Sequence, residues 1–198
     1  MASPACKSAL IVGAGHGVSA SLTRLFRNEG LAVSIAARDT GKLASLCAES
    51  GARAFACDAQ DAAQVERLFA EQVCAFGAFL VAQQAAARML PKGHGTILFT
   101  GASASVKGYA QSAPFAMGKF ALRGLAQSLA RELSPQGIHV AHFVIDGGIR
   151  GPGHGDDPAK PDALLEPDAI ALTYLNVLRQ PRSAWTWEVE LRPWVERF

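Results

Sequence analysis

A glycine-rich turn near the start of the chain is the pattern that most directly predicts chemistry. The apolar run Ala9–Val12 leads into the sequence GAGHG at Gly13–Gly17, and an amphipathic segment begins at Val18. A strand, a glycine turn and a helix in this order bring backbone N–H groups and the positive helix end to a dinucleotide pyrophosphate. Glycine-rich turns also join strands to helices for steric reasons alone. The turn predicts a dinucleotide site and leaves the steric alternative open.

These residues need a frame of alternating strands and helices. Apolar runs at Ala9–Val12, Leu31–Ala37 and Ala52–Cys57 alternate with helical segments, a pattern typical of a parallel sheet covered on both faces. We expect one α/β domain over residues 1–198, with a Rossmann-like, doubly wound parallel sheet. The later elements that we expect are a long helix at 62–90, strands at 95–100, 138–145 and 185–191, and helices at 114–133 and 168–178.

Composition limits the classes of function. The chain has 198 residues, 49% of them hydrophobic, which is enough for a sizeable core. A net charge of +2 without a long basic run argues against nucleic acid as a partner. We find no secretory signal and no apolar stretch long enough to span a membrane, so we expect a cytoplasmic protein. Four cysteines without CxxC spacing predict reduced thiols and no metal site.

Four local motifs resemble the short-chain dehydrogenase/reductase family over nearly the whole length. They are the glycine turn with Ser19 in place of its last glycine, Arg38 after the second strand, Asp58 after the third, and Asp146-Gly147-Gly148-Ile149. The resemblance implies a nicotinamide cofactor. It implies these cofactor-binding residues: Gly13, Gly15, His16, Gly17, Val18, Arg38, Asp58, Lys119, Gly147 and Ile149.

Arg38 bears on the choice of cofactor. Family members that prefer NAD carry an acidic residue at the position of Ala37, so the resemblance implies NADP(H) here. A guanidinium can stack on adenine and pair with a 2′-phosphate through two hydrogen bonds. An exposed arginine after a strand is also the commonest kind of solvated charge, and that alternative stays open.

At two of the family's three catalytic positions, this sequence has residues of a different chemical type. Its serine, tyrosine and lysine positions read Ala102, Phe115 and Lys119, so only the lysine is kept. Hydride transfer to a carbonyl needs a proton donor at the developing alkoxide, and phenylalanine has no proton to give. Retained chemistry would need a neighbouring hydroxyl, from Ser103, Ser105, Tyr109 or Ser112. Tyr109 is the preferred substitute, although its ring has the alternative role of covering apolar surface.

A second departure from the family lies between Glu71 and Ala75. The family carries an Asn-Asn-Ala-Gly-like strand end and a further catalytic asparagine in this region, and neither is present here. We expect a sheet that lacks one central strand. Either Gly95–Thr100 takes its place beside the first strand, or a gap is left in the sheet.

The sequence thus predicts an NADP(H)-binding protein related to oxidoreductases of carbonyl and alcohol substrates. The alternatives are a non-catalytic dinucleotide-binding or interaction protein and an inactive truncated variant. Helices Ala75–Leu90 and Pro114–Leu133 match the pair through which many family members associate, so we expect a homo-oligomer. Residues 147–167 are rich in Gly, Pro and Asp and form either a mobile lid or a solvated connection. Nothing in this stretch identifies a substrate.

Overall fold

The described elements form two compact units, each built on a parallel sheet. The computed structural model describes residues 6–57, 70–151, 155 and 157–196. One unit comprises residues 1–58, 147–179 and 193–198, and the other comprises residues 59–146 and 180–192. We call them the first and the second unit.

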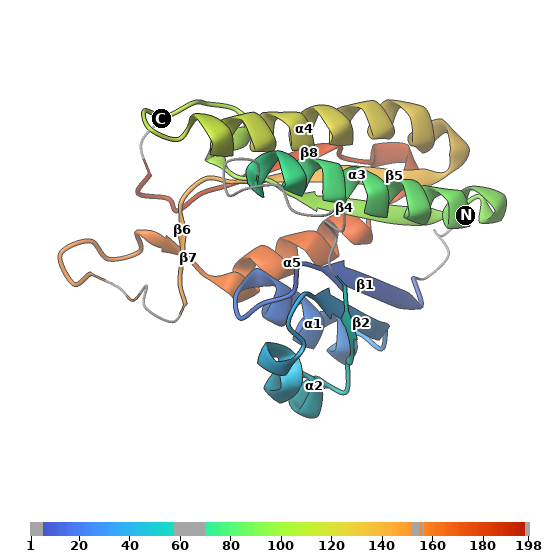
Figure 1. The fold of residues 1–198 in the computed structure, drawn as a ribbon, viewed down its shortest axis with the longest axis horizontal. Helices are drawn as coiled ribbons and strands as arrows, with labels where there is room; N and C mark the ends of the chain where they lie inside the picture. The colour runs from blue at the N-terminus through green and yellow to red at the C-terminus, as the bar shows by residue number, and fades with distance from the viewer. Residues whose placement is uncertain (1–5, 58–69, 152–154, 156, 197–198) are drawn as a thin grey trace. The chain divides into compact units, whose positions relative to one another are not determined.

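The first unit has a three-stranded parallel sheet in the order β1-β2-β3 (Figure 1). Its elements are β1 (Ser8–Val12), α1 (Val18–Asn28), β2 (Ala32–Ala37), α2 (Ala44–Ser50), β3 (Arg53–Ala56), β6 (Gly148–Ile149), β7 (Leu164–Leu165) and α5 (Pro167–Leu178). Helix α1 packs against α5, which comes from the far end of the chain. The short parallel pair β6-β7 joins the two ends of the stretch that the sequence marks as a lid or a solvated connection.

The second unit has a parallel sheet in the order β4-β5-β8. Its elements are α3 (Ala70–Met89), β4 (Gly95–Thr100), α4 (Ala113–Leu133), β5 (Ile138–Ile145) and β8 (Glu188–Leu191). Strand β5 lies between β4 and β8 and is buried along its whole length. Strand β8 lies at one edge of this sheet.

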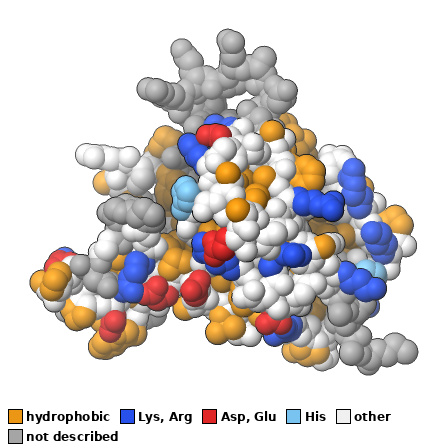
Figure 2. Space-filling view, turned by 90° about the horizontal axis from the view of Figure 1, so that it is seen from below, with side chains coloured by type: hydrophobic (Ala, Val, Ile, Leu, Met, Phe, Trp, Pro, Cys, Tyr) orange, Lys and Arg blue, Asp and Glu red, His pale blue; other side chains and the backbone are white. Residues whose placement is uncertain are grey.

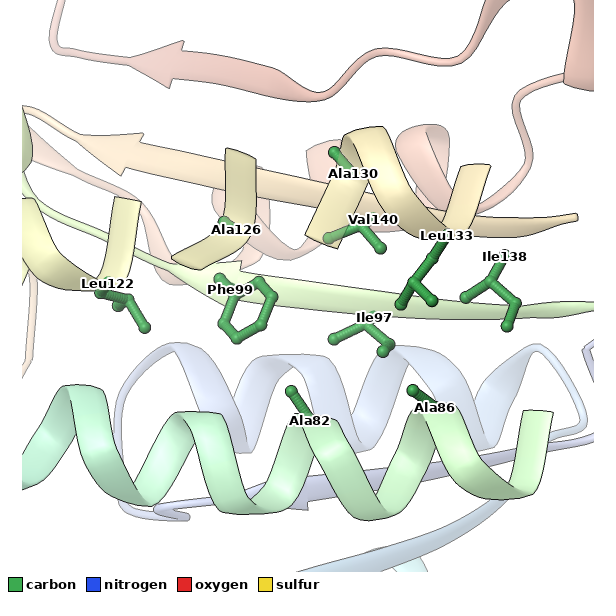
Figure 3. Close-up of a cluster of buried hydrophobic side chains, with 10 residues drawn as sticks. All are labelled: Ala82, Ala86, Ile97, Phe99, Leu122, Ala126, Ala130, Leu133, Ile138 and Val140. Atoms are coloured by element: carbon green, nitrogen blue, oxygen red, sulfur yellow. The ribbon is translucent and has the colours of Figure 1, made fainter. Parts of the chain in front are cut away.

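A hydrophobic cluster joins both long helices of the second unit to its sheet. Figure 3 shows Ala82 and Ala86 of α3 pointing toward Ile97 and Phe99 of β4. The small alanine side chains allow the helix to approach the sheet closely, and the larger side chains fill the space between. The cluster comprises Ala82, Ala86, Ile97, Phe99, Leu122, Ala126, Ala130, Leu133, Ile138 and Val140.

Two predicted boundaries are wrong for physical reasons. Helix α5 begins at Pro167, one residue before the predicted start at residue 168, with Glu166 in the cap position and Asp168 inside the first turn. Strand β8 begins at Glu188 and not at Trp185, because the N–H and the carbonyl of Thr186 bond to the side chains of Gln180 and His139 and not to another strand. The first residues of the predicted helix 62–90 lie outside the described residues, and α3 accounts for the rest.

The α/β class with parallel sheets is confirmed. The loss of a central strand stays a prediction. On the face drawn in Figure 2, basic and acidic side chains are interspersed with apolar ones, in keeping with the small net charge. No helix within the described part of the chain is long and apolar enough to cross a membrane.

Candidate dinucleotide site and catalytic frame

The glycine turn of the first unit is held by backbone and serine hydrogen bonds. The N–H groups of Gly13 and Ala14 both donate to the Ala36 carbonyl oxygen at 3.0 Å, which ties the turn to β2. The Gly15 N–H donates to Ser19 Oγ at 2.7 Å, and this hydroxyl donates back to the Gly15 carbonyl at 3.1 Å. Ser19, which takes the place of the family's last glycine, therefore fixes the turn from within.

Helix α1 begins directly after this turn. Gly17 is its cap residue and supplies no side-chain hydrogen bond to the first turn. The first N–H groups of a helix have no partner within the helix, and the helix dipole is positive at this end. Val18 is the first helical residue, and His16 is exposed on the turn before it. The turn can accept an anionic group.

Space above the turn distinguishes the cofactor interpretation from the steric one. Gly13 has φ +79°, so the backbone itself favours glycine there. Gly15 and Gly17 have no such φ, and a Cβ added to either would meet no atom of the described residues within 4 Å. The protein's own packing therefore gives no reason for these two glycines. A pyrophosphate that lies against the backbone would give one, so the residues fit a dinucleotide.

Arg38 lies at the carboxyl end of β2, on the same sheet edge as the glycine turn. Its side chain is exposed, and the Cys57 N–H donates to the Ala37 carbonyl at 3.0 Å, which keeps the ends of β2 and β3 together. Ligands of open parallel sheets bind beyond the carboxyl ends of the strands. The structure thus brings Arg38 and Gly13–Gly17 to one edge. Asp58, the predicted adenine contact, lies outside the described residues.

In the segment Gly147–Ile149, neighbouring atoms leave little space for a side chain at either glycine. A Cβ on Gly147, which has φ +151°, would lie 2.8 Å from Pro193 Cδ, and one on Gly148 would lie 2.7 Å from Leu164 Cδ2. Ile149 pairs with Leu165 in β6-β7. The positive φ and the Pro193 ring favour glycine at residue 147, whereas the end of the Leu164 side chain can shift to make room at residue 148, whatever Gly147 and Ile149 do toward a cofactor.

The catalytic frame lies in the second unit, at the carboxyl end of β4. Lys119 Nζ donates to the Thr100 carbonyl at 3.2 Å and lies 5.8 Å from the centroid of the Phe115 ring. Phe115 occupies the turn of α4 before Lys119, and its ring is 38% exposed. At Ala102 only the backbone is polar: its N–H donates to Ser105 Oγ at 3.1 Å. Lys119 is held in place, and no side-chain proton donor stands at residues 102 or 115.

A charge cluster at the end of β5 was not predicted. Asp146, whose side chain is 6% exposed, accepts from Lys107 Nζ at 3.0 Å and lies 3.5 Å from Arg192 Nη2. The hydrogen bond to Asp146 is the largest cause that raises the pKa of Lys107, and Tyr109 adds to the rise. The signal in the sequence is Asp146 itself, because a carboxylate at the end of a buried strand needs a cation.

A second polar network joins α4 to β5 and β8. Glu188 accepts two hydrogen bonds from Arg123, at 2.6 and 2.8 Å, and a third from Nδ1 of the fully buried His142 at 3.1 Å. Arg123 lowers the pKa of Glu188, and burial lowers the pKa of His142 against the opposing effect of Glu188.

The other histidine of β5 is also buried, and it lies apart from this network. Burial lowers the pKa of His139, whose Nε2–H donates to the Thr186 carbonyl at 2.9 Å. Among the residues that the structure describes, no three His, Cys, Asp or Glu side chains come together to hold a metal ion.

Comparisons with known proteins agree on one family. The model for short chain dehydrogenases matches residues 71–152. A short-chain dehydrogenase from Rhodopseudomonas palustris is 33% identical, with 96% of this chain and 100% of that chain covered and a TM-score of 0.78. An alcohol dehydrogenase from the archaeon Thermococcus sibiricus, solved with 5-hydroxy-NADP, is 21% identical, with 98% and 99% of the two chains covered and a TM-score of 0.78.

Curated relatives match over a shorter stretch. The 3-oxoacyl-[acyl-carrier-protein] reductase MabA of Mycobacterium avium is 40% identical over 73 residues, which are 37% of this chain and 28% of that protein. A short chain aldehyde dehydrogenase of Euphorbia lathyris is 38% identical over 69 residues, which are 35% of this chain and 24% of that protein. The chain thus aligns with under a third of each curated relative.

Proposed function

The chain belongs to the short-chain dehydrogenase family, and we propose that it binds NADP(H) at the glycine turn and acts on carbonyl or alcohol substrates. The observation that carries the proposal is the open space above Gly15 and Gly17, where a Cβ would meet nothing within 4 Å. A pyrophosphate against the first turn of α1 accounts for both glycines through backbone N–H contacts. The steric alternative accounts for Gly13, whose positive φ itself favours glycine.

The choice of NADP(H) over NAD(H) rests on Arg38. Its exposed guanidinium stands at the carboxyl edge of β2, after an alanine and not after an acidic residue. A guanidinium pairs with a 2′-phosphate through two hydrogen bonds between opposite charges, whereas a ribose hydroxyl offers it only an uncharged acceptor. The neighbour from Thermococcus sibiricus carries an NADP derivative, in keeping with this choice.

The remaining residues have separable roles in this proposal. His16 and Val18 border the pyrophosphate at the start of α1, and Asp58 contacts the adenine. Lys119 holds a ribose hydroxyl, and Gly147 and Ile149 offer backbone groups to the carboxamide. When bound, the cofactor supplies or accepts a hydride. The chain must supply the proton, and neither Ala102 nor Phe115 has one to give.

The loss of these two groups also favours a second candidate function, that of a non-catalytic dinucleotide-binding protein. In this case Lys119, held by Thr100 and lying over Phe115, keeps only its contact with the cofactor. Both candidates require NADP(H) binding. They differ in whether another side chain provides the proton.

Thermal unfolding with NADPH, with NADH and without nucleotide tests the proposal. A ligand that binds only the native state raises its apparent stability, by about 2.7 kcal/mol at a hundredfold excess over Kd. We expect a rise in Tm with NADPH and a smaller one with NADH at equal concentration. An unchanged Tm with both nucleotides would contradict the proposed function in either form.

We further propose that two copies of the chain associate through the outer faces of α3 and α4. These helices pack against each other and expose large apolar side chains that the second unit does not cover: Phe76, Phe79, Leu80, Met117 and Phe120. Ala121 and Gly124 are also exposed, and their small size means that they do not protrude from this face of α4. A second copy presents the same apolar side chains, so a symmetric pairing buries apolar surface on both sides.

A further inference from the structure

One side chain closes the glycine turn of the first unit on itself. Ser19 takes the place of the last glycine in the family motif, so this chain has a hydroxyl where the motif has no side chain. The Gly15 N–H donates to Ser19 Oγ at 2.7 Å, and the Ser19 hydroxyl donates to the Gly15 carbonyl at 3.1 Å. Both polar groups of the Gly15 backbone therefore bond to one side chain.

The first N–H groups of the turn differ in how easily they can be released to a ligand. Those of Gly13 and Ala14 both donate to the Ala36 carbonyl, so their release would loosen the turn from β2. The acceptor of the Gly15 N–H is a side chain that rotates about one bond, between Cα and Cβ. Rotation of Ser19 therefore releases the Gly15 N–H and leaves the tie to β2 intact.

The surroundings of Gly15 and Ser19 leave room for this rotation and for an anion. Gly15 is only partly buried, and a Cβ added to it would meet no atom of the described residues within 4 Å. The hydroxyl of the fully buried Thr23 donates to the Ser19 carbonyl at 2.7 Å and so fixes the Ser19 backbone. The Ser19 side chain can thus change rotamer while the start of α1 stays in place. An anion that lies against Gly15 competes with the Ser19 hydroxyl for one N–H group.

We propose that Ser19 regulates the nucleotide site, a role that rests on the proposed function. Without nucleotide, the Ser19 hydroxyl closes the turn through its two hydrogen bonds with Gly15. When NADP(H) binds, Ser19 rotates away and the Gly15 N–H is available to the pyrophosphate. Opening the turn breaks two hydrogen bonds, so the chain binds the nucleotide more weakly than a permanently open turn would. Ser19 thereby sets the affinity for the part that NADP(H) and NAD(H) share.

Removal of the Ser19 hydroxyl from the full chain tests this competition. Ser19→Ala leaves the turn open, and Ser19→Thr is the conservative variant that keeps a hydroxyl. Ser45→Ala, at an exposed serine of α2, is the matched control. Titration calorimetry measures the Kd of NADPH and of NADH. Hydrogen exchange followed by NMR measures the protection of the Gly15 amide without nucleotide, so it reads out the closed turn independently of any ligand.

We expect Ser19→Ala to bind NADPH about three- to tenfold more tightly, because the nucleotide no longer has to open the turn. The affinity for NADH should rise by the same factor, since both nucleotides contain the same pyrophosphate. Without nucleotide, the Gly15 amide of Ser19→Ala should exchange severalfold faster. Ser19→Thr and Ser45→Ala should match the wild-type chain in all three measurements.

Three results would overturn the regulatory role of Ser19, and they differ in what else they overturn. If the wild-type chain binds NADPH and Ser19→Ala binds it no more tightly than Ser45→Ala does, the competition is absent and the proposed function stands. If the Gly15 amide exchanges equally fast in Ser19→Ala and in the wild-type chain, the closed turn does not form. If no variant and no wild-type chain binds either nucleotide, the proposed function itself is wrong.

Discussion

Gly13 and Gly15 lie two residues apart, and we expect different effects when each is replaced by alanine: a loss of stability at Gly13 and a loss of nucleotide binding at Gly15. Gly13→Ala forces a Cβ onto φ +79°, which costs about 1 to 3 kcal/mol of stability. Gly15→Ala meets open space, so we expect an unchanged Tm without nucleotide and a lost rise in Tm with NADPH. Thermal unfolding of both variants with and without NADPH measures this. A Gly15→Ala variant that keeps the full rise would place the pyrophosphate elsewhere.

Arg38→Ala tests cofactor preference at a single side chain. We expect NADPH affinity to fall about tenfold, equivalent to about 1.4 kcal/mol, because the pairing with the 2′-phosphate is lost. NADH affinity should stay the same, since NADH has no such phosphate. Titration calorimetry with both nucleotides gives the two values. Arg53→Ala, an exposed arginine on β3, is the matched control. Equal losses for NADPH and NADH would count against the phosphate role.

Residues of the site differ in how far sequence alone could reveal them. The glycine turn, Arg38 and Lys119 are local patterns, and the structure places the first two at one sheet edge and holds the third at the end of β4. The pairing of Lys107 with Asp146 joins residues 39 positions apart, and no local pattern encodes such a pair. The sequence predicts that Asp146 needs a positively charged partner, but only the fold determines which residue that partner is.

At the scale of elements, the network of Arg123, His142 and Glu188 links helix to sheet and predicts a pH dependence. The folded-state pKa of His142 is lowered, so the unfolded chain binds more protons and stability falls as pH drops below about 6.5. The lowered pKa of Glu188 continues this loss below its ordinary value of 4.5. Urea unfolding between pH values on both sides of 6.5 measures the slope.

His142→Gln should flatten this slope between neutral pH and the ordinary pKa of histidine. Glutamine keeps a donor toward Glu188 but cannot titrate. His94→Gln, at an exposed residue before β4, is the matched control. An equally steep slope in His142→Gln would assign the pH dependence to other groups, His139 among them.

The cluster between α3, α4 and the sheet predicts a stability effect. Leu133, 2% exposed at the end of α4, fills space against Ile138. Leu133→Ala should lower the free energy of unfolding by about 2 to 5 kcal/mol, because a cavity remains. Leu172→Ala, on the exposed side of α5, should cost less than about 0.5 kcal/mol. Urea unfolding compares the two, and similar losses would contradict the packing described.

Element boundaries follow from sequence where a local pattern decides them. Strands β4 and β5 begin and end at the predicted residues, since apolar runs bounded by turn residues leave few alternatives. The start of β8 escapes prediction because the backbone groups of Thr186 bond to the side chains of Gln180 and of His139, which is 47 positions away in sequence. Similarly, Glu166 and not Asp168 precedes the first turn of α5 because Pro167 occupies the first helical position.

At the scale of the whole molecule, self-association is the property to measure. We expect a dimer by size-exclusion chromatography with light scattering. The double variant Phe76→Glu and Phe120→Glu should be monomeric, because it places like charges on both faces that meet. Phe55→Glu, 51% exposed on β3 of the first unit, is the matched control and should remain dimeric. A wild-type chain that elutes as a monomer would contradict the proposed pairing.

Helix α1 is synthesised well before α5, the helix that packs against it. Arg179, just after α5, forms an ion pair with Glu29 at the end of α1, across 150 positions of sequence. On the ribosome, at about 5 to 20 residues per second, this partner arrives roughly 8 to 30 s after α1 has been made. During that interval the α1 face that meets α5 has no intramolecular cover. Nascent chains of this protein should therefore depend on chaperones until α5 has been made.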